Sequence, residues 1–114
     1  MSITLLGAGE IRQIAESLDL RPTKSLGQNF VIDSNTCQKI VRLAGITSSD
    51  HVVEIGPGLG SLTLALLQAS DKVTAIEIDK RLADQLEITA KSHGASLKDL
   101  VIINADAMEV DEIS

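Results

Sequence analysis

The second half of the sequence alternates short β-branched runs with helical patterns, and this alternation constrains the fold more than any other feature. The runs are VVEI at 52–55, VTAIEI at 73–78 and LVII at 100–103. The segment 61–68 between the first two runs is apolar at most positions, as in a helix packed on a sheet, and the segment after Asp79 has apolar residues at helical spacing. Strands that alternate with helices pair in parallel through right-handed crossovers. We therefore predict an α/β fold in which three parallel strands carry flanking helices.

Two helices are predicted before the first strand. The first has apolar residues at Ile11, Ile14, Ala15 and Leu18, and Arg21-Pro22 should end it because proline disfavours helix in the residue before it. The second begins at Asp33 or Ser34, presents a face of Cys37, Ile40, Val41 and Ala44, and stops at Gly45. We divide the domain 1–114 into N-terminal helices with a loop, 1–50, and the first half of a sheet, 51–114.

Three glycines follow the first strand in the pattern G-x-G-x-G, at positions 56, 58 and 60. Glycine lets the backbone turn sharply and approach a ligand closely. The helix that follows offers unpaired N–H groups, which could hold a pyrophosphate. However, Pro57 removes one donor, and Ser61 stands where the dinucleotide fingerprint requires its third glycine. The turn therefore indicates a nucleotide-like ligand but matches a dinucleotide site imperfectly.

One acid stands at or near the carboxyl end of each predicted strand: Glu54, Glu77 and Asp106. Ligands of open α/β sheets bind at this end. Glu77 lies about 20 residues after Gly56, where a carboxylate can accept both ribose hydroxyls, as it also does in dinucleotide enzymes. Asp106 could accept a hydrogen bond from the amine of adenine. Because three acids favour a cation, S-adenosylmethionine fits better than a diphosphate.

Each acid also has a structural interpretation. Glu54 either faces the ligand through water or satisfies a backbone donor, and the sequence favours neither. Glu77 could be a plain surface acid, and Asp106 could be a cap or turn residue.

Composition narrows the class of protein further. The net charge of -6 opposes a polyanion over the whole surface, although a local basic patch stays possible. Cys37 is the single cysteine, so no intrachain disulfide forms and a reducing compartment is the simplest interpretation. No apolar run approaches the roughly 20 residues of a membrane span. We expect a cytoplasmic protein without a metal site or a membrane contact.

Four segments together resemble the ribosomal RNA adenine N6,N6-dimethyltransferase family, and within it the enzymes of small-subunit 16S rRNA. They are SLGQNFVID, VVEIGPGLGSLT, AIEID and NADAM. The resemblance starts near Lys24 and covers nearly all of the chain after it. It implies a Rossmann-like fold, S-adenosyl-L-methionine as cofactor, and methyl transfer to the N6 amine of adenosines in 16S rRNA, which would be the partner.

The resemblance also implies roles for particular residues. Gln28, Asn29 and Val31 would touch the methionine end of the cofactor, and Gly56 and Gly58 would pass beneath it. Glu77 and Ile78 would hold the ribose and adenine faces, and Asp106 and Ala107 would bind the adenine amine. These nine residues and Glu54 make up the predicted cofactor site of ten residues.

One family motif is absent. The Asn-Leu-Pro-Tyr type motif, which positions the target adenine, does not occur before Ser114. We therefore expect this chain to be the N-terminal part of a longer enzyme, inactive alone, with no catalytic residue and few RNA contacts of its own. The alternatives are a large-subunit dimethyltransferase, a non-catalytic assembly or transcription factor, and a nicotinamide-dependent oxidoreductase.

Overall fold

The fold follows the predicted order of helices and strands. A computed structural model describes residues 2–20 and 33–110. Its elements are α1 (Ala8–Ser17), α3 (Ser34–Ala44), β1 (His51–Ile55), α4 (Ser61–Ala69), β2 (Lys72–Glu77), α5 (Lys80–Ser92), β3 (Leu100–Asn104) and the short 3-10 helix η1 (Ala107–Glu109). All five predicted helices and strands after residue 51 are present, although β2 ends one residue before Ile78.

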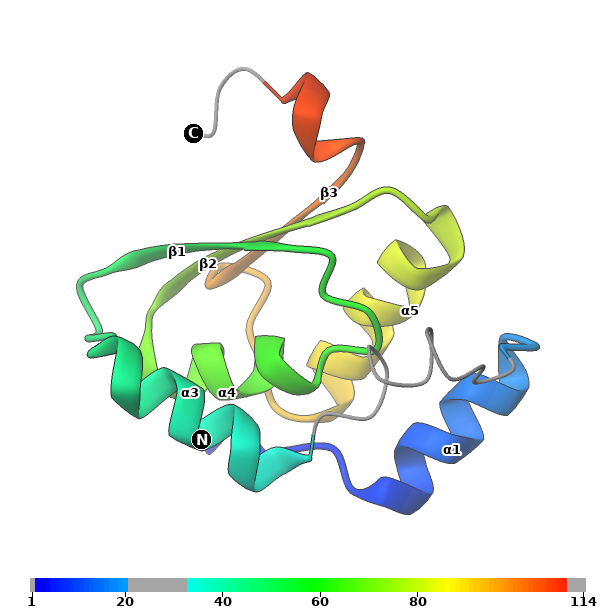
Figure 1. The fold of residues 1–114 in the computed structure, drawn as a ribbon, viewed down its shortest axis with the longest axis horizontal. Helices are drawn as coiled ribbons and strands as arrows, with labels where there is room; N and C mark the ends of the chain where they lie inside the picture. Colours follow the sequence, from blue (N-terminus) through cyan, green and yellow to red (C-terminus); the bar gives the residue numbers. More distant parts are fainter. Residues whose placement is uncertain (1, 21–32, 111–114) are drawn as a thin grey trace.

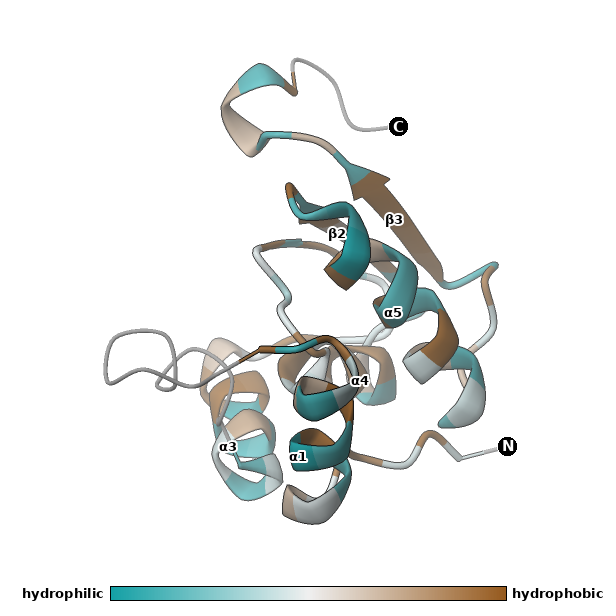
Figure 2. Cartoon of the chain, turned by 90° about the vertical axis from the view of Figure 1, so that its right-hand side faces the viewer, coloured by the Kyte–Doolittle hydropathy of each residue, from teal (hydrophilic) through white to brown (hydrophobic). Residues whose placement is uncertain are grey.

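The three strands form one parallel sheet in the order β1-β2-β3. α4 connects β1 to β2 and α5 connects β2 to β3, and Figure 1 shows α3 and α4 beneath β1 and β2. In Figure 2, β3 is apolar over most of its length, as expected of a strand packed on helices. The α/β class and the parallel pairing are confirmed.

The helix-covered face of the sheet carries an aliphatic core. The side chains of Val73 and Ala75 on β2 are fully buried against Ala65 and Leu66 of α4 and Leu86 of α5. The opposite face is more open, with Val53 and Ile55 of β1 exposed to 41% and 69%. Within the described residues β1 and β3 are the two edge strands, so the outer side of β1 has no sheet partner there. Among these same residues, no helix is both long and apolar enough to cross a membrane.

Helix α1 ends earlier than predicted, and proline is not the cause. The last helical residue is Ser17, because Asp19 adopts a left-handed conformation with φ of 55°. Asp19 N donates to Glu16 O at 3.0 Å and Leu20 N donates to Ala15 O at 2.8 Å. These two bonds form a Schellman motif, which satisfies carbonyls that the helix leaves unpaired.

Helix α3 has the predicted caps but a narrower buried face. Asp33 Oδ1 accepts from Thr36 N at 2.7 Å, and Gly45 ends the helix with φ of 68°. Cys37 and Val41 are buried, whereas Ile40 is 40% exposed and Ala44 is also exposed. The prediction for the last two residues is wrong because α3 packs on α4 along one narrow stripe.

Candidate functional site

The glycine turn between β1 and α4 bends the chain over the end of the sheet. Gly56 and Gly60 have φ of 70° and 102°, a conformation that side-chain-bearing residues rarely adopt. Gly56 N donates to Ile76 O at 2.9 Å, which continues the β1–β2 pairing into the turn. A Cβ atom on Gly60 would lie 2.7 Å from Leu86 Cδ1. The turn thus requires glycine both for its dihedral angles and for close packing on α5.

A hollow of about 400 Å³ lies beside this turn. The acids Glu54 and Glu77 line it from the ends of β1 and β2, together with Gly56 and Gly58. The other lining residues are Ile55, Pro57, Leu59, Ser61, Leu62 and Leu82. The structure therefore brings together four of the ten predicted site residues in one hollow.

Glu77 is a fixed and nearly buried acid, which excludes its interpretation as a plain surface residue. Its side chain is only 5% exposed. Gly58 N donates to Oε1 at 3.3 Å and Asp79 N donates to Oε2 at 3.1 Å. Since an ionised carboxylate has about four acceptor sites, it can still accept hydroxyl groups from a ligand.

Glu54 is a second buried acid on the wall of the same hollow. The Thr63 hydroxyl of α4 donates to its Oε1, so the described partner is a side chain and not the backbone donor considered from the sequence. The pKa of Glu54 is raised to about 7, chiefly by burial; the Thr63 hydrogen bond acts to lower it and the negative charge of Glu77 to raise it. The hollow therefore has a negative wall whose charge depends on pH near neutrality.

A second hollow, of about 240 Å³, adjoins the first and shares Ile55, Gly56 and Glu77 with it. Ile78, Asp106 and Ala107, the three residues predicted to surround adenine, line it with Ile76, Ala105 and Met108. Asp106 Oδ1 accepts from Met108 N at 3.0 Å and caps η1, so the cap interpretation of Asp106 is correct for this oxygen. Asp106 also lines the second hollow, so its predicted hydrogen bond to the adenine amine is compatible with its role as a cap.

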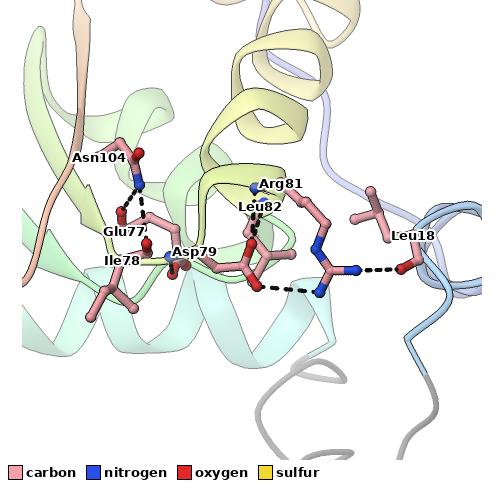
Figure 3. Close-up of polar contacts among 7 residues, drawn as sticks. All are labelled: Leu18, Glu77, Ile78, Asp79, Arg81, Leu82 and Asn104. Carbon is pink, nitrogen blue, oxygen red and sulfur yellow. Dashed lines mark hydrogen bonds and ion pairs between the residues drawn. The ribbon is translucent and has the colours of Figure 1, made fainter.

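Sequence reasoning missed two residues of this region. Asn104, at the end of β3, donates through Nδ2 to Glu77 O at 2.9 Å and to Ile78 O at 3.1 Å (Figure 3). Ser61 Oγ is buried beside the first hollow, and no hydrogen-bond partner reaches it within residues 2–20 and 33–110. The sequence signal that could have indicated Asn104 is its place as a polar residue directly after the apolar run 100–103.

Asp79 and Arg81 join this region to helix α1. Asp79 caps α5, and Arg81 donates through Nη2 to Asp79 Oδ2 at 3.4 Å and through Nη1 to Leu18 O at 3.1 Å (Figure 3). The hydrogen bond from the Arg81 side chain, followed by backbone donors, lowers the pKa of Asp79. The end of α1 is thus held near the end of β2.

The predicted residues Gln28, Asn29 and Val31 lie outside the described residues, so their roles stay predictions. In the part of the chain that the structure describes, no cluster of histidine, cysteine and acidic side chains could hold a metal ion.

Comparison with protein families gives a match over most of the chain. The model of the family described as "Ribosomal RNA adenine dimethylase" matches residues 20–114. "Ribosomal RNA small subunit methyltransferase A" of Corynebacterium jeikeium is 63% identical over 108 residues, which cover 95% of this chain. The same alignment covers only 34% of that relative, so this chain spans about a third of its length.

Solved structures of a dimethyladenosine transferase and of an rRNA methyltransferase share the fold. A dimethyladenosine transferase from Plasmodium falciparum superimposes with a TM-score of 0.64 at 33% identity, covering 72% of this chain and 29% of the other. The 23S rRNA methyltransferase ErmE superimposes with a TM-score of 0.62 at 31% identity, covering 73% and 32%. These structures confirm the Rossmann-like fold that the family resemblance implies.

Proposed function

This chain belongs to the ribosomal RNA adenine dimethylase family, and on that premise we propose that its two hollows bind S-adenosylmethionine. Membership in a methyltransferase family implies a methyl donor. The chemistry of this donor is a methyl group on a positively charged sulfur. The residues of this chain would bind and orient it.

The observation that carries the proposal is the way in which Glu77 occupies the glycine turn. A diphosphate at such a turn needs backbone N–H groups. Here Pro57 has none to offer, and Gly58 N already donates to the Glu77 carboxylate. A diphosphate would meet the Glu77 carboxylate, and above about pH 7 that of Glu54 as well, whereas a sulfonium and an ammonium group would be attracted to this negative charge.

The shape and donors of the site suit an adenosine with an amino-acid tail. Glu77 has acceptor capacity left for the ribose hydroxyls, and Gly56 and Gly58 leave room beneath the tail. Ser61 Oγ, buried without a described partner, offers a hydroxyl to a polar group of the tail. Ile78, Asp106 and Ala107 line the adjoining hollow, where adenine would lie and its amine would donate to Asp106. Gln28, Asn29 and Val31 are expected to contact the methionine end.

For the whole protein we propose methylation of the N6 amine of adenosines in small-subunit 16S rRNA. The relative of 63% identity is named for the small subunit, while the structure named for 23S rRNA is 31% identical over a smaller share of this chain. This difference favours the small subunit over the large one. The target would approach across the carboxyl end of the sheet, where the methyl donor lies.

Isothermal titration calorimetry tests the proposed cofactor site. S-adenosylmethionine should bind to this chain, and Glu77→Ala should weaken binding by about tenfold or more, because hydrogen bonds to a charged group contribute roughly 1.5–3 kcal/mol. Glu16→Ala, on the exposed side of α1, is the matched control and should bind as the unmodified chain does. Equal affinity of the Glu77→Ala variant would refute the role of Glu77.

A further inference from the structure

The side chain of Asn104 extends the pairing of β2 and β3 beyond the end of the sheet. In the register of the two strands, Glu77 is the last residue of β2 and pairs with Asn104. Ala105 N donates to Glu77 O at 3.1 Å, which is the last backbone bond of this edge. Asn104 Nδ2 adds bonds to Glu77 O at 2.9 Å and to Ile78 O at 3.1 Å. Both partners are carbonyl oxygens, so the amide uses its two N–H donors.

These bonds hold the segment in which the two hollows meet. The carboxylate of Glu77 faces the first hollow, and Ile78 and Asp106 line the second. Asn104 lines neither of them. Asn104 is the last residue of β3 and lies two residues before Asp106. Its side-chain amide connects this end of β3 to the backbone of both Glu77 and Ile78 (Figure 3). The residue can therefore act on a ligand only through the placement of its neighbours.

We propose that Asn104 is a positioning residue that sets Glu77 and Asp106 at the separation required to bind ribose and a 6-aminopurine together. This assignment rests on the proposed function of the two hollows. Glu77 is already fixed by Gly58 N and Asp79 N. Without the Asn104 amide, the end of β3 and Asp106 can shift relative to that fixed carboxylate. Adenine would then lose its bond to Asp106, while the ribose and the amino-acid tail would keep their contacts.

The test compares two ligands that differ only in the base. S-adenosylhomocysteine has the 6-amine, and its purine-riboside analogue has a hydrogen atom on C6 in its place, so the analogue has no donor there for a carboxylate. The unmodified chain should bind the adenosyl compound at least about fivefold more tightly, the factor expected of one hydrogen bond. Asn104→Ala should bring this ratio close to one, mainly by weakening the adenosyl compound. Asp106→Ala should do the same.

A structural role alone gives a different result. If Asn104→Ala weakens both ligands by the same factor and the ratio is unchanged, the positioning role is overturned while the proposed function stands. If the unmodified chain binds neither ligand, the proposed function and this assignment are both overturned. Asn35→Ala, an exposed asparagine on α3, is the matched control and should leave the ratio unchanged. If Asn104→Ala does not fold, Asn104→Ser keeps one donor and should show an intermediate ratio.

Discussion

Replacing Glu54 with glutamine should make the stability of the chain less sensitive to pH. The pKa of Glu54 is raised from 4.5 to about 7, chiefly by burial, so the folded chain holds a proton that the unfolded chain releases. The stability that protonated Glu54 contributes to the fold is therefore fully present below about pH 4.5. This stability is lost as the pH rises through about 7, because the folded chain must then bury a charged carboxylate. The shift corresponds to about 3 kcal/mol.

Glutamine has nearly the same shape, carries no charge, and can still accept from the Thr63 hydroxyl. Urea unfolding at about pH 4 should give similar free energies for the two chains. At about pH 8, Glu54→Gln should be more stable by up to about 3 kcal/mol, because the unmodified chain must then bury a charge near Glu77. Glu16→Gln, at an exposed position on α1, controls for the loss of one acid. If Glu54→Gln and the unmodified chain lose stability equally between these pH values, the assignment of Glu54 as a buried, protonated acid is refuted.

Three further predictions concern the turn, a cap and the edge of the sheet. Gly60→Ala should lower the free energy of unfolding by about 1–3 kcal/mol, because φ of Gly60 is 102° and the added Cβ would lie 2.7 Å from Leu86 Cδ1. The control in thermal unfolding is Gly7→Ala, whose added Cβ would have no heavy atom of the described residues within 4 Å, its chain neighbours aside. Asp33→Ala should cost about 1 kcal/mol through loss of the α3 cap, and a loss as small as that of the exposed Glu16→Ala on urea unfolding would contradict this. The open edge of β1, with Val53 and Ile55 exposed, should make the chain associate as its concentration rises; a constant monomer in size-exclusion chromatography would count against it.

The fold was predictable because its main signals are local in the sequence. The β-branched runs, the glycine turn, and the caps Asp33 and Asp79 each mark an element boundary without reference to distant residues. Two errors arose where tertiary structure decides. The end of α1 depends on a left-handed Asp19, a conformation that no residue type other than glycine signals well. The exposure of Ile40 depends on how narrowly α3 packs on α4.

The candidate site was predictable only in part. Strand ends that share one edge of a parallel sheet explain why Glu54 and Glu77 line the same hollow. The sequence could not show that Glu54 is bonded to Thr63, since that contact depends on how α4 rotates against β1. It could not show the bonds of Asn104 either, because the register of β2 and β3 brings Asn104 beside Glu77.

The most direct test of the central claim, a cation-binding glycine turn, is a titration followed by amide NMR. S-adenosylmethionine should shift the Gly56 and Gly58 amide signals and leave that of Gly45, at the distant end of α3, in place. NAD at the same concentration should leave all three signals unchanged. Shifts of Gly56 and Gly58 with NAD, and none with S-adenosylmethionine, would contradict the account.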